Sequence, residues 1–112
     1  MAKQYERIML KLSGEALGKD GRLFDHEKID QVAGILKQAA DSGVQLGIVI
    51  GAGNLWRGRL GGAAGMDAVS ADMMGMLGTV MNCLCMKEAL LRHGVHAHVM
   101  SALEMPRVAE TY

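Results

Sequence analysis

The stretch "IMLKLSGEAL", residues Ile8–Leu17, joins an alternating apolar pattern to a polar turn that contains a glycine. Apolar residues recur at every second position between residues 5 and 13, which predicts a β-strand. The apolar face of this strand consists of Ile8, Leu10 and Leu12. Lys11 lies on the opposite face, and because burying an unpaired ammonium group is costly, this lysine requires either solvent or an anionic partner.

Helical and strand patterns alternate along the rest of the chain. Asp25 precedes apolar residues at helical spacing, so we expect a helix that Asp25 caps and that continues to about Asp41. The run "VQLGIVIG" (44–51) is short, apolar and rich in β-branched residues, which is typical of a strand covered on both faces. The other expected segments are a glycine-rich loop (14–24), a long helix (68–93), a third strand at "VHAHVM" (95–100) and a tail (101–112).

The long helix is apolar around nearly its whole circumference in its first half. Such a helix must be buried on more than one side, either within the fold or against another subunit. Gly75 and Gly78 leave a groove on the helix in which another backbone can lie close. The methionine-rich part, Met73–Met86, is interrupted by polar residues, and we expect it to be too short to span a bilayer.

The order of strand, helix, strand, helix and strand predicts a three-layer α/β/α fold with a mainly parallel sheet and right-handed crossovers. A chain of 112 residues amounts to one domain or part of one. Because this chain stops just after the third expected strand, the sheet would have few strands and an uncovered edge. We therefore expect the chain to be the first part of a larger domain.

Composition argues against several classes of partner. The 12 basic and 12 acidic side chains cancel, and the pI is about 6.9, so no net positive field is present to hold nucleic acid or an anionic membrane. Cys83 and Cys85 would lie roughly 200° apart around a helix, which suits neither a disulfide nor a shared metal. Reduced thiols, and an N-terminus that runs directly into a strand without a signal peptide, favour a cytoplasmic protein.

Two common phosphate-binding motifs do not fit. "GEALGKD" has one residue too few for a P-loop and ends in Asp20 where Ser or Thr is needed, and Trp56 stands where a GxGxxG motif needs its last glycine. A simpler device remains, because the carboxyl ends of parallel strands share one rim of the sheet. There, exposed backbone N–H groups would bind phosphate oxygens. These belong to Gly14, Gly51, Ala52 and Gly53.

Several candidate side chains have two interpretations from the sequence alone. Lys11 either adds positive charge to this rim or extends into solvent from an edge strand. Arg57 either clamps a phosphate or is merely solvated, and Asp72 either caps a helical turn or accepts hydrogen bonds from a sugar hydroxyl. His96 and His98 share one face of the expected third strand, but no third ligand stands nearby in the sequence, so no metal site is expected.

Three motifs in this order carry a family resemblance: "MLKLSGEALG", "IVIGAGNLWRG" and "DMMGMLGTVMN". Together they resemble the bacterial-type uridylate kinases of the amino acid kinase family, over nearly the whole chain but only the amino-terminal half of such an enzyme. The resemblance implies an incomplete, carbamate kinase-like fold and phosphoryl transfer from ATP to UMP, with Mg²⁺ on the nucleotide phosphates. Residues 1–112 would be the part that binds UMP and phosphate, without the carboxyl-terminal ATP-binding portion.

Carried over residue by residue, the resemblance assigns catalytic roles to Lys11 and Arg57. The ATP and phosphate contacts would be made by Lys11, Leu12, Ser13, Gly14, Gly53 and Arg57. Ala52 falls where the family usually has a glycine that touches UMP, and its methyl group would lie beside the ligand. Asp72 would bind the uridine ribose. Lys11 would stabilise charge on the transferred phosphoryl group, without a covalent intermediate.

The resemblance also implies a homo-oligomer, in which dimers build a hexamer and the methionine-rich helix contributes to the dimer contact. It places the loop from Gly18 to Leu23 where some relatives respond to GTP, with UTP as another possible effector. Without the missing half, we expect weak nucleotide binding and negligible turnover. Two alternatives stay open: a kinase of this fold that acts on a carboxylate, and a non-catalytic oligomerisation or regulatory fragment.

Overall fold

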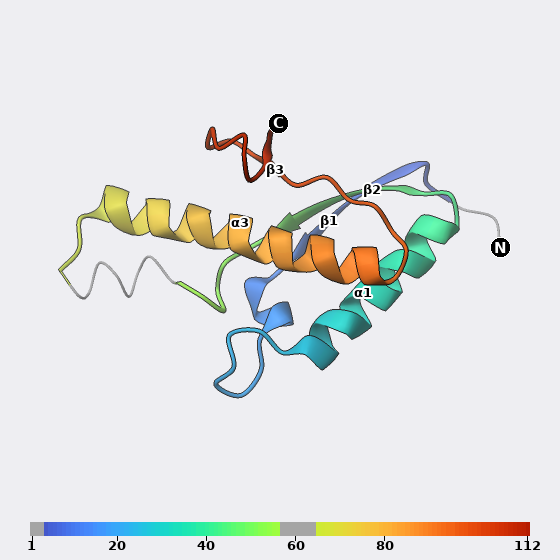
Figure 1. The fold of residues 1–112 in the computed structure, drawn as a ribbon, viewed down its shortest axis with the longest axis horizontal. Coiled ribbons are helices and arrows are strands. Elements are labelled where there is room, and N and C mark those ends of the chain that lie inside the picture. The colour runs from blue at the N-terminus through green and yellow to red at the C-terminus, as the bar shows by residue number, and fades with distance from the viewer. Residues whose placement is uncertain (1–3, 57–64) are drawn as a thin grey trace.

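The computed structural model describes residues 4–56 and 65–112 (Figure 1). The order of its elements is β1 (Arg7–Leu12), the 3₁₀ helix η1 (Gly14–Leu17), α1 (His26–Asp41), β2 (Gln45–Ile50), α3 (Ala68–Arg92), β3 (Met100–Ser101) and β4 (Glu110–Thr111). The first two predicted strands and both predicted helices are confirmed. Asp25 is the N-cap of α1, as predicted, and its carboxylate accepts a hydrogen bond from the N–H group of Lys28.

β1 and β2 form a parallel pair, with α1 as the crossover between them. In their register Leu12 lies beside Ile50, and Lys11 lies beside Val49. Leu10, Leu12 and Ile50 join the apolar core, whereas the side that carries Lys11 is exposed. The predicted apolar face of β1 is therefore confirmed for Leu10 and Leu12, whereas Ile8 at its start is 36% exposed.

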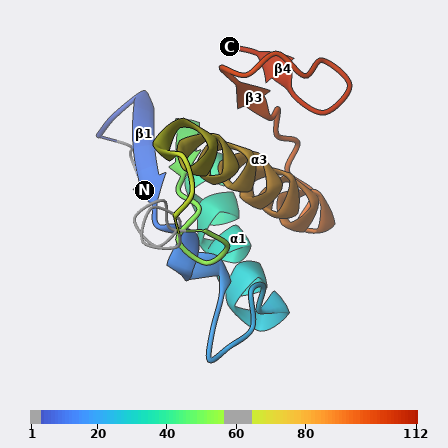
Figure 2. The ribbon, with the colours of Figure 1, turned by 90° about the vertical axis from the view of Figure 1, so that its left-hand side faces the viewer.

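Both helices pack on the same face of this strand pair, as Figure 2 shows with β1 at one side and α1 and α3 at the other. The core contains buried residues from every one of these layers: Leu17, Ile29, Ala33, Leu36, Ile50, Met86, Ala89 and Leu90. The opposite face is open, since Met9 is 71% and Val49 51% exposed. The expectation that β2 is covered on both faces is thus wrong for the described residues, which contribute two layers of the α/β fold.

The helix α3 changes character along its length. Its first half carries large exposed apolar side chains, and its second half is packed in the core. The exposed set is Val69, Met73, Met74, Met76, Leu77 and Met81. By length and composition alone this 25-residue helix would be able to cross a membrane. The shorter segment Met73–Met86 had predicted that the methionine-rich part is too short to do so. Core helices of soluble proteins meet the same two criteria.

The third predicted strand is wrong. Side chains from Val95 to Val99 do alternate between inward and exposed positions, but among the described residues only the last of them bonds to a strand, through the Val99 carbonyl, which accepts from the N–H group of Glu110 at 2.8 Å. Only Met100–Ser101 is β-structure, and it pairs in parallel with Glu110–Thr111, within the segment expected to be a tail. Alternation reports which side of the chain faces the core, whereas a strand also needs a neighbour for its backbone hydrogen bonds.

Candidate active site

The ends of β1 and β2 meet on one rim of the sheet. The N–H group of Gly51 donates to the carbonyl of Leu12 at 3.0 Å, which extends the strand pairing by one residue. Gly14, at the start of η1, lies directly against the turn that follows β2: a β-carbon at Gly14 would be 2.6 Å from the nitrogen of Gly53 and 2.7 Å from the carbonyl oxygen of Gly51. The predicted common rim is therefore confirmed.

The segment after β1 is more ordered than the predicted loop. Ser13 caps η1, because its Oγ accepts a hydrogen bond from the N–H group of Glu15 at 3.2 Å. Beyond η1, Lys19 and Arg22 form a β-bridge around Asp20 and Gly21, which both have positive φ angles. Two consecutive residues with positive φ are the signature of a tight hairpin turn, and this geometry explains why Gly21 stands there.

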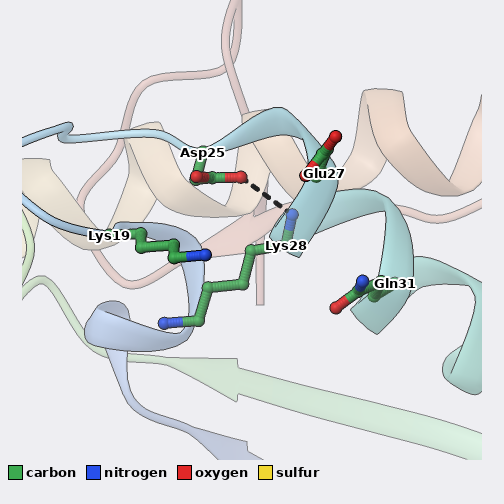
Figure 3. Close-up of a pocket in the computed structure, with 5 residues that line it drawn as sticks. All are labelled: Lys19, Asp25, Glu27, Lys28 and Gln31. Carbon is green, nitrogen blue, oxygen red and sulfur yellow. Dashed lines mark hydrogen bonds between the residues drawn. The ribbon is translucent and has the colours of Figure 1, made fainter.

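The far end of η1 is tied to the start of α1 through Lys28, whose backbone N–H group donates to Asp25 (Figure 3). The Lys28 ammonium donates to the carbonyl oxygens of Glu15 and Gly18, both at 2.8 Å. A cavity of about 270 Å³ opens beside this junction, lined by Lys19, Asp25, Glu27, Lys28 and Gln31. Asp25 caps the start of α1, and the Lys28 ammonium binds carbonyls at the end of η1. The cavity therefore belongs to the scaffold that holds η1 in place, away from the strand tips.

Asp25 is charged under all ordinary conditions. The hydrogen bond from the backbone N–H of Lys28 lowers the pKa of the Asp25 carboxyl below its usual value of 3.8, and the positive charges of Lys19 and Arg22 lower it further. Partial desolvation opposes these effects without reversing them. The cap at the start of α1 is therefore fully ionised near neutral pH.

The turn after β2 is packed into α3. The carbonyl of Ala52 accepts hydrogen bonds from the N–H groups of Leu55 and Trp56 at 2.9 and 2.8 Å, which closes the turn. A β-carbon at Gly78 would lie 2.9 Å from that of Ala52, and one at Gly75 would lie 3.6 Å from the ring of Trp56. The groove predicted at the two glycines is thus confirmed, and the chain's own turn fills it.

Two asparagines that the sequence did not single out for the site hold this turn. Asn82 of α3 is fully buried; its amide donates to the Gly51 carbonyl and to the Asn54 side chain, both at 2.7 Å. In return, the Asn54 amide donates to the oxygen of the Asn82 side chain at 3.2 Å and to the Leu23 carbonyl at 2.9 Å. The available signal was a single amide side chain within the otherwise apolar run "TVMNCLCM".

Some backbone donors of the rim are left without an acceptor among the described residues. Within residues 4–56 and 65–112, the N–H groups of Gly14, Ala52 and Gly53 donate to no protein acceptor. The N–H group of Gly51 is used by the strand pair, so its predicted role as a phosphate donor is wrong. Clustered backbone donors that meet no acceptor among the described residues are able to bind phosphate oxygens.

The predicted side chains are placed unequally. Lys11 is exposed, and neither a hydrogen bond nor an ion pair joins its ammonium to another described residue. Asp72 is also exposed, in the first turns of α3, and it does not cap that helix, because Asp67 is the N-cap. Leu12 contributes the carbonyl that binds Gly51. Arg57 lies outside the described residues.

The histidine and cysteine side chains form no metal cluster in the parts of the chain that are described. His98 lies 3.0 Å from the Glu110 carboxylate on the exposed surface, and His96 is exposed as well. Cys83 and Cys85 are free thiols, and burial raises the pKa of each above its usual value of 9.0. Both thiols are therefore protonated and weakly reactive at neutral pH.

Comparison with known proteins decides the family. Residues 6–111 match the model of the amino acid kinase family. The chain belongs to the amino acid kinase family. Within this family it is 48% identical over 110 residues to the uridylate kinases of two strains of Streptococcus thermophilus, a match that covers 97% of this chain and 45% of theirs.

Solved structures of the same family agree with the fold. The UMP kinase from Bacillus anthracis superposes with a TM-score of 0.91 at 36% identity, and the UMP kinase from Ureaplasma parvum with a TM-score of 0.90 at 32% identity. These matches cover 98% and 97% of this chain, and 46% of each of those chains. The chain thus spans about half the length of its amino acid kinase relatives, and the predicted incomplete amino acid kinase fold is confirmed.

Proposed function

We propose that this chain is the amino-terminal, UMP- and phosphate-binding portion of a cytoplasmic uridylate kinase, which transfers the γ-phosphoryl group of ATP to UMP and yields UDP. The names of the relatives support the substrates. The observation that carries the proposal is the rim itself, where the ends of two strands bring together three backbone N–H groups that have no acceptor among the described residues. The carboxyl-terminal portion of the relatives would supply the ATP site.

The chemistry asked of this chain is positioning and charge stabilisation. The amides of Gly14 and Gly53 would bind the oxygens of the phosphoryl group in transit, and Ser13 and Leu12 would keep η1 and β2 in register beneath it. Lys11, near the end of β1 and exposed, would neutralise the charge that develops on the transferred group. No nucleophile of the protein and no covalent intermediate is required.

The UMP contacts would come from the turn and from α3. Ala52 would lie against the nucleotide through its backbone, Asp72 would accept hydrogen bonds from the ribose, and Arg57 would pair with phosphate. The rim residues present N–H donors, which bind phosphate oxygens and not cations. Mg²⁺ therefore enters as the ion carried by the phosphates of ATP, where it would neutralise charge between them.

The apolar surface on the first half of α3 supports the proposed oligomer. Exposed methionines and Leu77 lie on this half, and exposed apolar side chains gathered on one helix are typical of an interface between subunits. We place the dimer contact there, as the unit from which a hexamer is built. GTP or UTP would act as effectors, with the hairpin between Gly18 and Leu23 as the responsive loop.

Two other functions compete with this proposal. A non-catalytic oligomerisation fragment is favoured by the same apolar surface, since it would use α3 without any need for the rim. A carboxylate kinase of the same fold would use the rim without any need for Asp72. Phosphorylation of glutamate in preference to UMP would establish the second alternative, whereas a stable dimer that ignores UMP would establish the first.

A hybrid enzyme tests the proposal. Residues 1–112 would replace the matching 110-residue segment of the Streptococcus thermophilus uridylate kinase, and UDP formation would be measured with UMP and Mg·ATP. We expect activity in the hybrid and negligible turnover by the 112-residue chain alone. Lys11→Ala should lower kcat by orders of magnitude while leaving UMP affinity nearly unchanged.

The matched control is Lys37→Ala. Lys37 is a half-buried lysine of α1 whose ammonium pairs with Asp41 at 2.7 Å, far along the sequence from the rim. Its removal should leave kcat unchanged, because a surface ion pair contributes little. A folded hybrid whose kcat is equally insensitive to both substitutions would show that Lys11 is not catalytic.

A further inference from the structure

Asn82 is the one fully buried side chain of α3 in the described residues that carries a polar group. All of its hydrogen-bonding capacity toward the turn is used, since its amide donates twice and its oxygen accepts from Asn54. A polar group buried among apolar neighbours is retained at a cost, which only a complete set of partners offsets. Its partners therefore indicate its purpose, and both belong to the turn after β2.

The two ends of that turn are fixed by this pair. At the first end, Gly51 is bonded on both sides, through its N–H group to Leu12 and through its carbonyl to Asn82. At the other end, Asn54 is bonded to Asn82 and to the Leu23 carbonyl. Between these fixed points lie Ala52 and Gly53, whose N–H groups donate to no acceptor within the described residues.

We propose that Asn82, together with Asn54, is a positioning residue of the proposed phosphate site. It touches neither substrate nor reacting atoms; it fixes the turn so that the amides of Ala52 and Gly53 stay available beside Gly14. The alternative for a free turn of this length is to satisfy its amides internally or to move them away from β1. Donors held in place before the ligand arrives bind more tightly, because less ordering remains to be done on binding.

The same pair connects the rim to the hairpin after η1. The Asn54 amide reaches the carbonyl of Leu23, and a β-carbon at Gly18 would lie within 2.9 Å of the Leu23 carbonyl oxygen. The end of the hairpin, the end of β2 and the middle of α3 thus share one set of hydrogen bonds. A displaced Asn54 therefore affects all three segments, whereas a displaced core residue of α3 affects only packing.

The test uses the 112-residue chain labelled with ¹⁵N, with UMP and inorganic pyrophosphate as the probes in NMR titrations. Asn82→Leu removes both donors at similar side-chain size, and Asn54→Ala removes the partner from the less buried side. We expect both variants to bind each probe about tenfold more weakly, a loss that corresponds to about 1.4 kcal/mol. We also expect shifted amide resonances and faster hydrogen exchange at Ala52 and Gly53.

The matched control is Met86→Val, which loosens the buried core of the same helix one turn further on. It should lower stability while leaving the Ala52 and Gly53 resonances and the affinities unchanged. Unchanged affinities and resonances in a folded Asn54→Ala variant would overturn the proposal, as would equal losses in Met86→Val. If Asn82→Leu does not fold, Asn54→Ala decides alone.

The inference rests on the proposed function only for its ligand. If the unaltered chain binds neither UMP nor pyrophosphate, the proposed phosphate site fails, and the resonances and exchange rates of the two amides still decide whether Asn82 positions the turn. If the unaltered chain binds both probes and the Asn54 and Asn82 variants bind them equally well, the phosphate site stands and the positioning role is refuted.

Discussion

The close approach of the two strand tips makes a sharp prediction about Gly14. An added β-carbon there would meet three atoms at 2.6–2.7 Å: the Gly53 nitrogen, the Gly51 oxygen and the Asn54 side-chain oxygen. Two of these are backbone atoms, and the third is held by Asn82 at 2.7 Å, so none can move away at little cost. Gly14→Ala must therefore separate the end of β1 from the turn after β2.

The size of the change in unfolding free energy follows from opposing effects. Forcing an extra methyl group into a packed site costs about 1–3 kcal/mol, and weakening the Asn54–Asn82 hydrogen bond adds about 1 kcal/mol. Replacing glycine lowers the entropy of the unfolded chain and offsets about 0.4–1 kcal/mol of this cost. We expect Gly14→Ala to lower the free energy of unfolding by about 1–3.5 kcal/mol.

Gly34 provides the matched comparison, because it lies inside α1 and the nearest neighbour of an added β-carbon is an atom of the His93 ring at 3.8 Å. This is ordinary contact, and alanine is favoured over glycine inside a helix by about 1 kcal/mol. Gly34→Ala should therefore raise the free energy of unfolding. The same chemical change thus has opposite signs at the two positions.

Urea unfolding measures both effects, with the far-UV circular dichroism of the whole chain and the fluorescence of Trp56 as probes. Trp56 is the only tryptophan of the sequence; it ends the turn after β2, and its indole N–H donates to the Ala71 carbonyl at 2.8 Å. Its fluorescence therefore reports on the turn that Gly14→Ala disturbs. Equal midpoints for Gly14→Ala and the unaltered chain, or a loss in Gly34→Ala of the same size, would refute the reasoning.

Three further predictions follow from the packing and the titrating groups. Gly78→Ala should be destabilising, because its methyl group meets that of Ala52. Adding Ala52→Gly should restore stability in urea unfolding, and a loss of stability that persists in the double variant would contradict the contact. A hydrogen bond from a backbone N–H group lowers the pKa of the Asp25 carboxyl in the folded chain. The contribution of this carboxylate to stability is therefore complete above its unfolded pKa of 3.8, and it is lost as the pH falls through the lower folded pKa. The difference in unfolding free energy between the unaltered chain and Asp25→Asn should shrink below about pH 4 and stay constant above about pH 5. Burial raises the pKa of Cys83 and Cys85, so a thiol reagent at pH 8 should modify them slowly in the folded chain and rapidly in urea, and equal rates would show that the thiols are not protected.

Local patterns were sufficient for the elements that position the site. The alternation around Lys11, the N-cap at Asp25 and the long apolar run before Arg92 each depend on neighbours within a few residues, and β1, α1 and α3 follow them closely. The third strand failed for the opposite reason. Val95–Val99 has the right alternation, but a strand is completed by a partner elsewhere in the chain, and the alternation carries no information about that partner.

The candidate site was likewise predictable in part from the sequence. That the tips of β1 and β2 share a rim follows from parallel pairing, so the region was predictable without coordinates. Which amides remain free was not, because the pattern that placed Gly51 at the end of a strand does not show that the Gly51 N–H group pairs with Leu12. A difference of one residue in pairing decides whether a backbone donor serves the fold or a ligand.

Asn82 shows why inspection of a sequence finds charged site residues more readily than the buried residues that hold a site in shape. Lys11 stands out because a charge in a strand requires a reason, whereas a single amide in an apolar helix reads as an interruption. Its meaning depends on Gly51 and Asn54, each about thirty residues away, and only the packing of α3 against the turn brings them within 2.7 Å. A buried amide that bonds a backbone group and a side chain together fixes a loop more firmly than a surface charge can, because the amide itself has no access to water as an alternative. The polar residues of an apolar helix are therefore the place to look for the groups that hold a backbone-lined anion site in shape.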